Sequence, residues 1–146
     1  MTENIFVNPE RPLPDQNNRL YAPYFEGLQN QQLNIQQCEQ CSHTQMPPRE
    51  FCFHCHSSAL TWTPVAPRGT LYTYSIVYRA FDAWFKERTP YGIVVIELEE
   101  GNRILGNYFG EDVETLACGL PMEGYFEKVD ESTTLLQWKK SVIFEG

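Results

Sequence analysis

The sequence predicts a mainly β protein, in which an N-terminal helix and a small metal-binding ribbon precede a five-stranded barrel. Three observations lead to this prediction: four of the five cysteines form two closely spaced pairs, β-rich segments follow one another after Pro67, and proline-rich polar residues come before both. We divide the 146 residues into an extended arm (1–20), a helix and ribbon (21–61) and a barrel (62–146).

The arm should be extended, because its prolines stand among polar and charged residues and leave it without a core of its own. It also carries four apolar side chains, and scattered apolar anchors on a flexible strip suit a segment that becomes ordered on a partner. These four are Ile5, Phe6, Val7 and Leu13.

A short helix should follow the arm. Pro23 suits the first turn of a helix. Tyr24, Phe25 and Leu28 then form one apolar face. We expect this helix to end near Asn30, before a strand in which apolar and polar residues alternate through "LNIQQC".

The clustered cysteines predict a zinc site. They form two C-x2-C pairs separated by ten residues. Two residues between thiolates let a tight turn direct both sulfurs at one ion, and two such turns complete the tetrahedron of structural zinc. With cysteine at all four positions, none is left for water or substrate, so we expect one structural ion per chain. The predicted ligands are Cys38, Cys41, Cys52 and Cys55.

Two other uses of these cysteines are less favoured, a disulfide framework and a redox pair. Disulfides suit secreted proteins, whereas "MTENIFVNPE" has no basic region followed by an apolar stretch and predicts no secretory signal. A redox C-x-x-C should open a helix, and here Pro47 and Pro48 follow the first pair. Zinc is the favoured prediction.

No catalytic residue is predicted. All three histidines, His43, His54 and His56, lie in the cysteine segment, where four thiolates already satisfy the metal, so we expect them to decorate the turns. Residues 62–146 contain no histidine and one cysteine, so neither a Cys–His nor a Ser–His–Asp arrangement can form within the barrel. That cysteine, Cys118, is more typical of a small buried hydrophobe near a turn.

Five segments rich in β-branched and aromatic residues predict the barrel. They are "GTLYTYSIVYRAF", "YGIVVIELEE", "NRILGNYFG", "PMEGYFEKVD" and "TTLLQWKKSVIF". Turn residues around Gly101 separate the second segment from the third, and only "EDVETLAC" leaves room for a short helix or turn. Five antiparallel strands curl to avoid exposed edges, and an OB-type barrel is the common solution.

One segment of this half, "FDAWFKERTP", differs from the strands, since Trp84 and Phe85 stand in a loop among charged residues. Large apolar side chains rimmed by charge indicate a contact surface, so these two are the predicted partner-binding residues. A local cluster that folds back on the barrel is the alternative.

The net charge of −8 is spread along the chain, with six acids against three arginines in residues 1–61 and thirteen acids against eight basic residues in 62–146. Nucleic-acid binding needs a local positive field, so we expect no nucleic-acid partner. The longest apolar run, "YGIVVIEL", is too short to cross a bilayer, so we expect no membrane partner and a soluble, cytoplasmic protein.

Taken together, these segments resemble a family of small proteins built from an N-terminal helix, a rubredoxin-like zinc ribbon and an OB barrel, long catalogued as a domain of unknown function and associated with acyl-CoA enzymes. The resemblance begins at about residue 20 and depends on "YFEGLQNQQLNIQQC", "PPREFC", "GTLYTYSIVYR", "PYGIVVIELEEGNRILGN" and "GLPMEGYFE". The chain departs from the family after each cysteine pair, where the family tends to have glycine and this chain has Ser42 and His56.

The resemblance implies a non-catalytic subunit that bridges or stabilises thiolase-fold catalytic subunits in a hetero-oligomer handling acyl-CoA or related acyl donors. Length and arrangement are also similar to a small subunit of an acetyltransferase complex that acts on a phloroglucinol-type acceptor.

Three other functions stay open. One is a free-standing acyl-CoA binding module, with Arg79, Lys86 or Arg88 on the phosphates. Another is a nucleic-acid-binding zinc-ribbon and OB protein, against which the charge argues. An independent enzyme would have to use carboxylates such as Glu97, Glu99 and Glu100, which are more typical of the solvated end of a strand.

Overall fold

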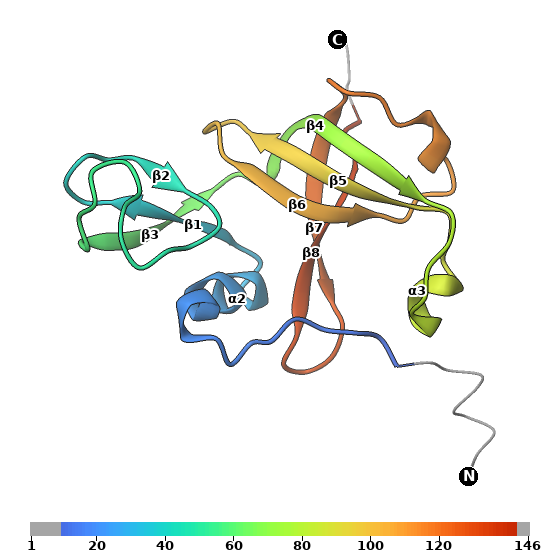
Figure 1. Cartoon of the computed structure of the whole chain (residues 1–146), viewed down its shortest axis with the longest axis horizontal. Coiled ribbons are helices and arrows are strands. Elements are labelled where there is room, and N and C mark those ends of the chain that lie inside the picture. Colours follow the sequence, from blue (N-terminus) through green and yellow to red (C-terminus); the bar gives the residue numbers. More distant parts are fainter. Residues whose placement is uncertain (1–9, 143–146) are drawn as a thin grey trace.

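The computed structural model describes residues 10–142, which form two antiparallel sheets with one helix packed against both (Figure 1). The first sheet has the strand order β2-β1-β3, and the second has the order β6-β5-β4-β7-β8. The predicted mainly β fold, with an N-terminal helix, a ribbon and an OB-type barrel, is confirmed. The elements are the 3-10 helix η1 (Arg19–Tyr21), helix α2 (Ala22–Gln29), strands β1 (Leu33–Cys38), β2 (Thr44–Gln45), β3 (Leu60–Val65) and β4 (Arg68–Val77), helix α3 (Ala83–Lys86), strands β5 (Tyr91–Leu98) and β6 (Arg103–Tyr108), the 3-10 helix η2 (Val113–Thr115), and strands β7 (Pro121–Lys128) and β8 (Thr134–Lys140).

Helix α2 begins and ends where the sequence predicts. Pro23 lies in its first turn, where a missing backbone N–H costs nothing. At the other end the Asn30 N–H donates to the Gly27 carbonyl at 2.9 Å. The buried Leu28 faces the core, and the rings of Tyr24 and Phe25 pack against its edge.

The ribbon sheet continues directly into the barrel. Strands β1 and β3 pair along their whole length, from Leu33 opposite Val65 to Cys38 opposite Leu60. Only residues 66 and 67 then separate β3 from β4. The buried residues of α2 and β1 form one hydrophobic core with those of the barrel, so the two sheets share a single interior.

Strand β4 is the centre of the barrel sheet. It pairs with β5 along most of its length and with β7 through its first residues, and its register shifts between Leu71 and Thr73. Such a bulge bends and twists a strand, which lets β4 pair with a different strand on each side as the sheet curls. Helix η2 lies within "EDVETLAC", the segment that the sequence left open for a short helix or turn. Helix α3 was not predicted.

The two end strands of the sheet, β6 and β8, close the barrel by side-chain packing. No β6–β8 ladder occurs within residues 10–142, but the two strands lie close together. Trp138, which is fully buried, projects from β8 toward Gly106 on β6. A Cβ atom at position 106 would lie 2.5 Å from Cδ1 of the Trp138 ring, so only glycine fits there without a shift.

Within the described range, none of the helices is long and apolar enough to cross a membrane. The apolar arm residues Ile5, Phe6 and Val7 lie outside that range, and Leu13, the fourth, is exposed.

We predict that Gly106→Ala destabilises the fold by roughly 1–3 kcal/mol, because the added methyl group overpacks the Trp138 ring. Thermal unfolding measures the change. Leu105→Ala is the matched control, since Leu105 directly precedes Gly106 in the same strand and is 68% exposed. Equal melting temperatures for Gly106→Ala and the wild-type chain would contradict the packing account.

Candidate metal centre

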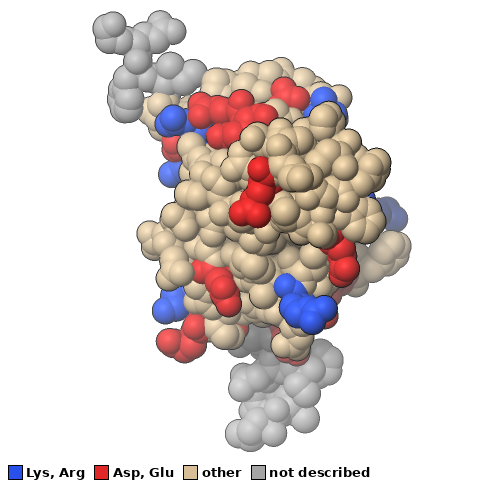
Figure 2. Space-filling view, turned by 90° about the vertical axis from the view of Figure 1, so that its left-hand side faces the viewer, with Lys and Arg blue, Asp and Glu red and all other residues tan. Residues whose placement is uncertain are grey.

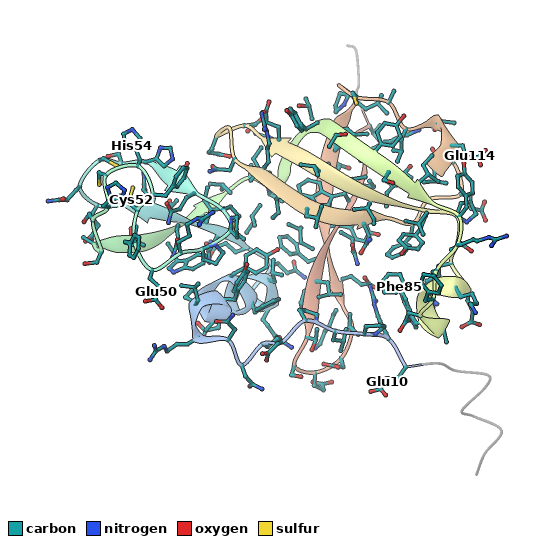
Figure 3. The ribbon with its side chains drawn as sticks, viewed as in Figure 1. Glu10, Glu50, Cys52, His54, Phe85 and Glu114 are labelled. Carbon is teal, nitrogen blue, oxygen red and sulfur yellow. The ribbon has the colours of Figure 1, made fainter. Side chains whose placement is uncertain are left out.

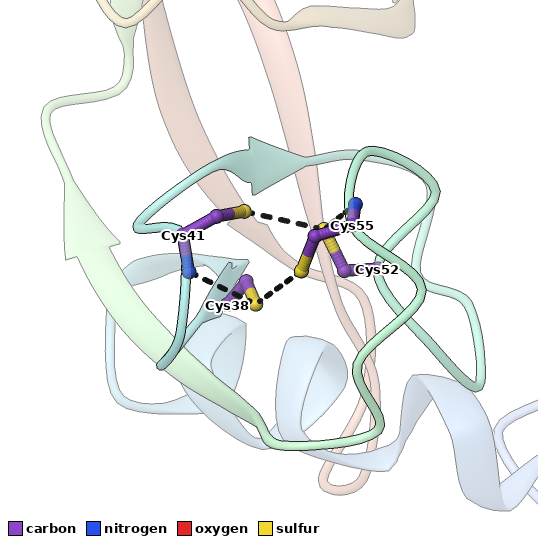
Figure 4. A group of neighbouring side chains, drawn as sticks. All are labelled: Cys38, Cys41, Cys52 and Cys55. Atoms are coloured by element: carbon purple, nitrogen blue, oxygen red, sulfur yellow. Dashed lines mark hydrogen bonds between the residues drawn. The ribbon is translucent and has the colours of Figure 1, made fainter.

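The four predicted ligands converge on one point in the ribbon (Figure 4). Their sulfur atoms all lie within 4.8 Å of one another, and the Sγ–Sγ distances are 3.5 Å for Cys38–Cys55 and 3.6 Å for Cys41–Cys52. A tetrahedral zinc ion with Zn–S bonds of about 2.3 Å would separate its sulfurs by roughly 3.8 Å. The cluster therefore has the size and donor set of a structural zinc site, with every ligand position filled.

Each cysteine pair forms the same kind of turn. In the first, the N–H groups of Gln40 and Cys41 point at Sγ of Cys38, at 3.4 and 3.5 Å. In the second, the N–H groups of His54 and Cys55 point at Sγ of Cys52, both at 3.4 Å. Hydrogen bonds of this kind stabilise a thiolate, which is the form that binds a metal.

The acidities of the thiols follow from these contacts. The backbone N–H of Cys41, with other donors, lowers the pKa of Cys38 to about 7. For Cys41, the N–H of His43 acts to lower the pKa, but burial and the neighbouring thiols outweigh it and raise the value to about 12. Because zinc binds thiolates, loading the centre must release protons, and zinc affinity falls as the pH falls.

The residue after each pair adopts a left-handed backbone. Ser42 has φ 64° and His56 has φ 68°, a conformation that glycine adopts without strain. Their N–H groups donate to the carbonyls of Cys38, at 3.0 Å, and Cys52, at 2.7 Å, which closes each turn. Ser42 and His56 thus adopt the same backbone conformation that glycine would adopt here, although a side chain disfavours that conformation.

Two buried glutamines hold the second turn against the first. The Gln45 amide donates to Oε1 of Gln36 at 2.8 Å and accepts from the N–H of Phe53 at 3.2 Å. Gln36 in turn exchanges hydrogen bonds with the backbone of Arg49, at 2.8 and 2.9 Å. The sequence did not single out these glutamines, because the same residue type is common on exposed surfaces.

The histidines lie outside the sulfur cluster, as expected. The rings of His43 and His54 stack on each other, with centroids 5.0 Å apart, and His43 also meets the edge of Phe53. Figure 3 shows His54 at the outer surface of the ribbon, beyond Cys52.

Cys118 does not occupy the buried position that we expected. It is exposed, in a turn where Gly119 has φ 93°. The flanking leucines explain this, because Leu116 is buried and Leu120 packs against the core, and the turn between them faces outward. The acids Glu99 and Glu100 are likewise exposed, at the turn that follows β5.

Trp84 and Phe85 lie in α3, at the opposite end of the molecule from the ribbon (Figures 1 and 3). The Asp82 carboxylate caps this helix by accepting from the N–H groups of both residues. The two rings are half-buried and pack with Tyr91 and Phe109, with centroid distances of 4.9 to 6.4 Å. They therefore form the local cluster that was the alternative to an open contact surface, and part of each ring remains accessible.

The arm is attached to this cluster through Arg11. Its guanidinium lies 4.3 Å from the Trp84 ring centroid and donates to both carboxylate oxygens of Glu127, at 2.8 and 3.1 Å. Arg88 stacks on the same indole at 3.5 Å. The hydrogen bonds from Arg11 hold the pKa of Glu127 below its usual value. Sequence reasoning missed this contact, because Arg11 and Glu127 are 116 positions apart.

Charges are scattered over the face that carries the ribbon. Figure 2 shows Lys and Arg side chains there as separate spots among uncharged surface, with acids gathered more closely in one area. The ion pairs between described residues are mostly exposed, such as Arg68–Glu99 at 3.0 Å and Arg103–Glu97 at 3.3 Å, and such pairs contribute little to stability.

The fold and the centre together define a class of protein, a four-thiolate zinc ribbon joined to an OB-fold barrel. Family models match both parts: residues 25–61 match the rubredoxin-like zinc ribbon domain of ChsH2, and residues 62–127 match the C-terminal OB-fold domain of ChsH2. A DUF35 domain-containing scaffold protein of Methanocaldococcus jannaschii is 34% identical over 95 residues, which cover 64% of this chain and 67% of that protein. The chain belongs to the DUF35 family.

Two further relatives have names that refer to enzymes. A probable enoyl-CoA hydratase alpha subunit of Thermomonospora curvata is 30% identical over 125 residues, which cover 86% of this chain but only 39% of that subunit. A solved structure described as an Ltp2-ChsH2(DUF35) aldolase has a TM-score of 0.79 at 29% identity and covers 90% of this chain and 100% of the matched chain. The chain thus spans less than half of the hydratase subunit and the whole of the ChsH2 structure's matched chain.

We predict that the purified protein contains about one equivalent of zinc, held with an apparent free energy on the order of 10 kcal/mol. Elemental analysis measures the content, and circular dichroism during chelation measures the structural role. Cys41→Ala should lose the metal, whereas the matched variant Cys118→Ala should keep it, because Cys118 lies outside the sulfur cluster. A chain that keeps its fold after complete zinc removal would show that the metal is not structural.

We also predict that Ser42→Gly strengthens the centre. Glycine relieves a left-handed strain of roughly 1–2 kcal/mol and loses part of that gain to backbone entropy. Competition with a chelator should therefore show zinc affinity higher by a few-fold. Ser58→Gly is the control, because Ser58 does not have positive φ and glycine there should be neutral or slightly destabilising. Weaker zinc binding by Ser42→Gly would count against the strain.

Proposed function

We propose that this chain is a non-catalytic subunit that bridges or stabilises a thiolase-like acyltransferase complex acting on acyl-CoA or related acyl donors. The observation that carries the proposal is the metal centre, in which four cysteine sulfurs surround one point and leave no position for a substrate. The barrel sequence adds no histidine, and its single thiol is Cys118. A chain whose metal site is closed and whose barrel half contains no histidine is suited to holding other subunits in place.

The relatives support the same proposal. The archaeal relative is named a scaffold protein, and the matched solved structure is described as an aldolase of Ltp2 with ChsH2. The hydratase relative is an alpha subunit, which by its name belongs with a further subunit. Carried over to this chain, these names favour a hetero-oligomer with a catalytic partner, for which we propose a thiolase fold.

The specific reaction that we propose is acetyl transfer to a phloroglucinol-type acceptor. Its support is the similarity of length and arrangement described above.

Trp84 and Phe85 are the proposed partner contacts, since each ring keeps an accessible part at the surface of its cluster. Nucleic acid is not proposed as a partner, because the chain has a net charge of −8 and its basic side chains stand apart on the ribbon face.

A second candidate, an acyl-CoA binding module, is favoured by one pocket. It has a volume of about 470 Å³ and combines two guanidinium groups with three aromatic rings. Isothermal titration of the isolated chain with CoA distinguishes the candidates, because micromolar binding without a partner favours the module. The lining residues are Arg11, Trp84, Arg88, Phe109, Tyr125 and Glu127.

The test of the leading proposal starts from the partner. A tagged chain expressed in its native host should co-purify with a thiolase-fold protein, identified by mass spectrometry. The isolated chain should show no acyltransferase activity, and the assembled complex should show it. Cys118→Ala should leave the activity of the complex within a few-fold of the wild-type value, since the thiol is not proposed to react.

Two results would contradict this. Acyltransferase activity of the isolated chain would make it an enzyme, and a loss of several orders of magnitude in Cys118→Ala with assembly intact would identify Cys118 as a nucleophile. Co-purification with proteins unrelated to acyl-CoA chemistry would remove the proposed class of partner.

A further inference from the structure

The loop between β4 and α3 presents an unusually exposed aromatic side chain. Phe81 has a relative exposure of 104%, the highest among the large hydrophobic side chains of residues 10–142. Three residues earlier, Tyr78 is 59% exposed. Isolated exposed apolar residues are common on protein surfaces, but a fully exposed phenylalanine three residues from a second exposed aromatic residue is a strong candidate for a contact.

This loop is fixed at both ends. The Tyr78 hydroxyl donates to Oε1 of Glu114 at 3.0 Å, so the ring is held while its face stays open to solvent. At the other end, Asp82 follows Phe81 directly and caps α3. The rings of Trp84 and Phe85 in α3 are packed into the aromatic cluster on the barrel. Phe81 is therefore held out by a short segment with little conformational freedom to lose on binding.

The surroundings of Phe81 match the anatomy of a protein interface. Exposed charged residues of both signs flank Phe81 in the sequence, and two of them, Arg79 and Glu87, form no ion pair with any residue of the described range. An apolar anchor surrounded by a solvated polar rim is the arrangement in which a few aromatic residues dominate binding energy. The acidic chain, with a net charge of −8, is poorly suited to an anionic membrane surface.

We propose that Phe81, supported by Tyr78, is the anchor by which the chain docks into an apolar surface pocket of the catalytic subunit. This inference rests on the proposed function, because that function supplies the partner. Phe81 adds an anchor beside the proposed contacts Trp84 and Phe85, whose packing in the aromatic cluster fixes the base of the loop.

The test compares two phenylalanines of similar chemistry at opposite ends of the molecule. Phe81→Ala should weaken binding to the purified thiolase-fold subunit by about thirtyfold, the usual effect of truncating an interface anchor. Phe51→Ala is the matched control, since Phe51 is 54% exposed and lies in the ribbon. Its affinity should stay within about threefold of the wild-type value, and both variants should keep the wild-type melting temperature and zinc content.

Each other outcome identifies a different error. If the wild-type chain binds the thiolase-fold subunit and the affinity of Phe81→Ala stays within threefold of the wild-type value, the inference is overturned and the proposed function is left intact. An equal loss in Phe51→Ala would overturn Phe81 as the specific anchor. A wild-type chain that binds no thiolase-fold subunit removes the proposed function, and the docking inference with it.

Two further measurements distinguish the partner from other occupants. Cosedimentation with phosphatidylserine–phosphatidylcholine vesicles should show no binding by the wild-type chain, and vesicle binding abolished by Phe81→Ala would assign the ring to a membrane. Analytical ultracentrifugation of the isolated chain should show no self-association through this loop. A dimer dissociated by Phe81→Ala would assign the ring to a second copy of the chain. Either result would overturn the inference.

Discussion

The ribbon half depends on one constraint, the tetrahedral coordination of a single metal ion by four thiolates. Between β1 and β3 the only regular element is the two-residue strand β2, and most side chains in that stretch are half-buried or exposed. Such a segment buries too little apolar surface to offset the conformational entropy of its own ordering. Metal binding by the four sulfurs and the hydrogen bond between the Gln36 and Gln45 amides supply the stabilisation that this segment lacks without a hydrophobic core.

The barrel meets a different constraint, the closure of a five-stranded sheet. Strand β4 bends at its bulge so that β5 and β7 can flank it, and the end strands β6 and β8 then approach without a ladder. Where the other neighbouring strands of the sheet are joined by backbone hydrogen bonds, β6 and β8 are joined by the packing of the Trp138 indole against Gly106. The Trp138 indole N–H is buried without a hydrogen-bond partner within the described residues, which is a cost of closing the barrel this way.

The sequence allowed the elements to be predicted closely, because their signals are local. Pro23, the alternation around Ile35 and the β-branched runs depend only on neighbouring residues, and the doubled C-x2-C spacing carries its geometry within a few positions. The arm's path was not predictable, since the contact of Arg11 with Glu127 joins residues far apart in the chain. For Trp84 and Phe85 the sequence left two alternatives, a contact surface and a local cluster. It could not decide between them, because the packing of these rings depends on Tyr91 and on Phe109, which lies further along the chain.

The junction between the two sheets has a mechanical consequence. Residues 66 and 67 alone join β3 to β4, and the Pro67 carbonyl accepts from the N–H of Gly124 at 2.7 Å. The Thr44 hydroxyl donates to the Asn102 side-chain oxygen at 2.9 Å, and the Asn102 side-chain nitrogen donates to the Thr44 backbone carbonyl at 3.1 Å. With a shared core as well, ribbon and barrel cannot pivot freely about this joint. The ribbon tip and the α3 end, at opposite ends of the long axis in Figure 1, are thus kept at a set spacing and orientation. Two proteins bound at these two ends would therefore be held at a distance and orientation that the rigid chain between them sets.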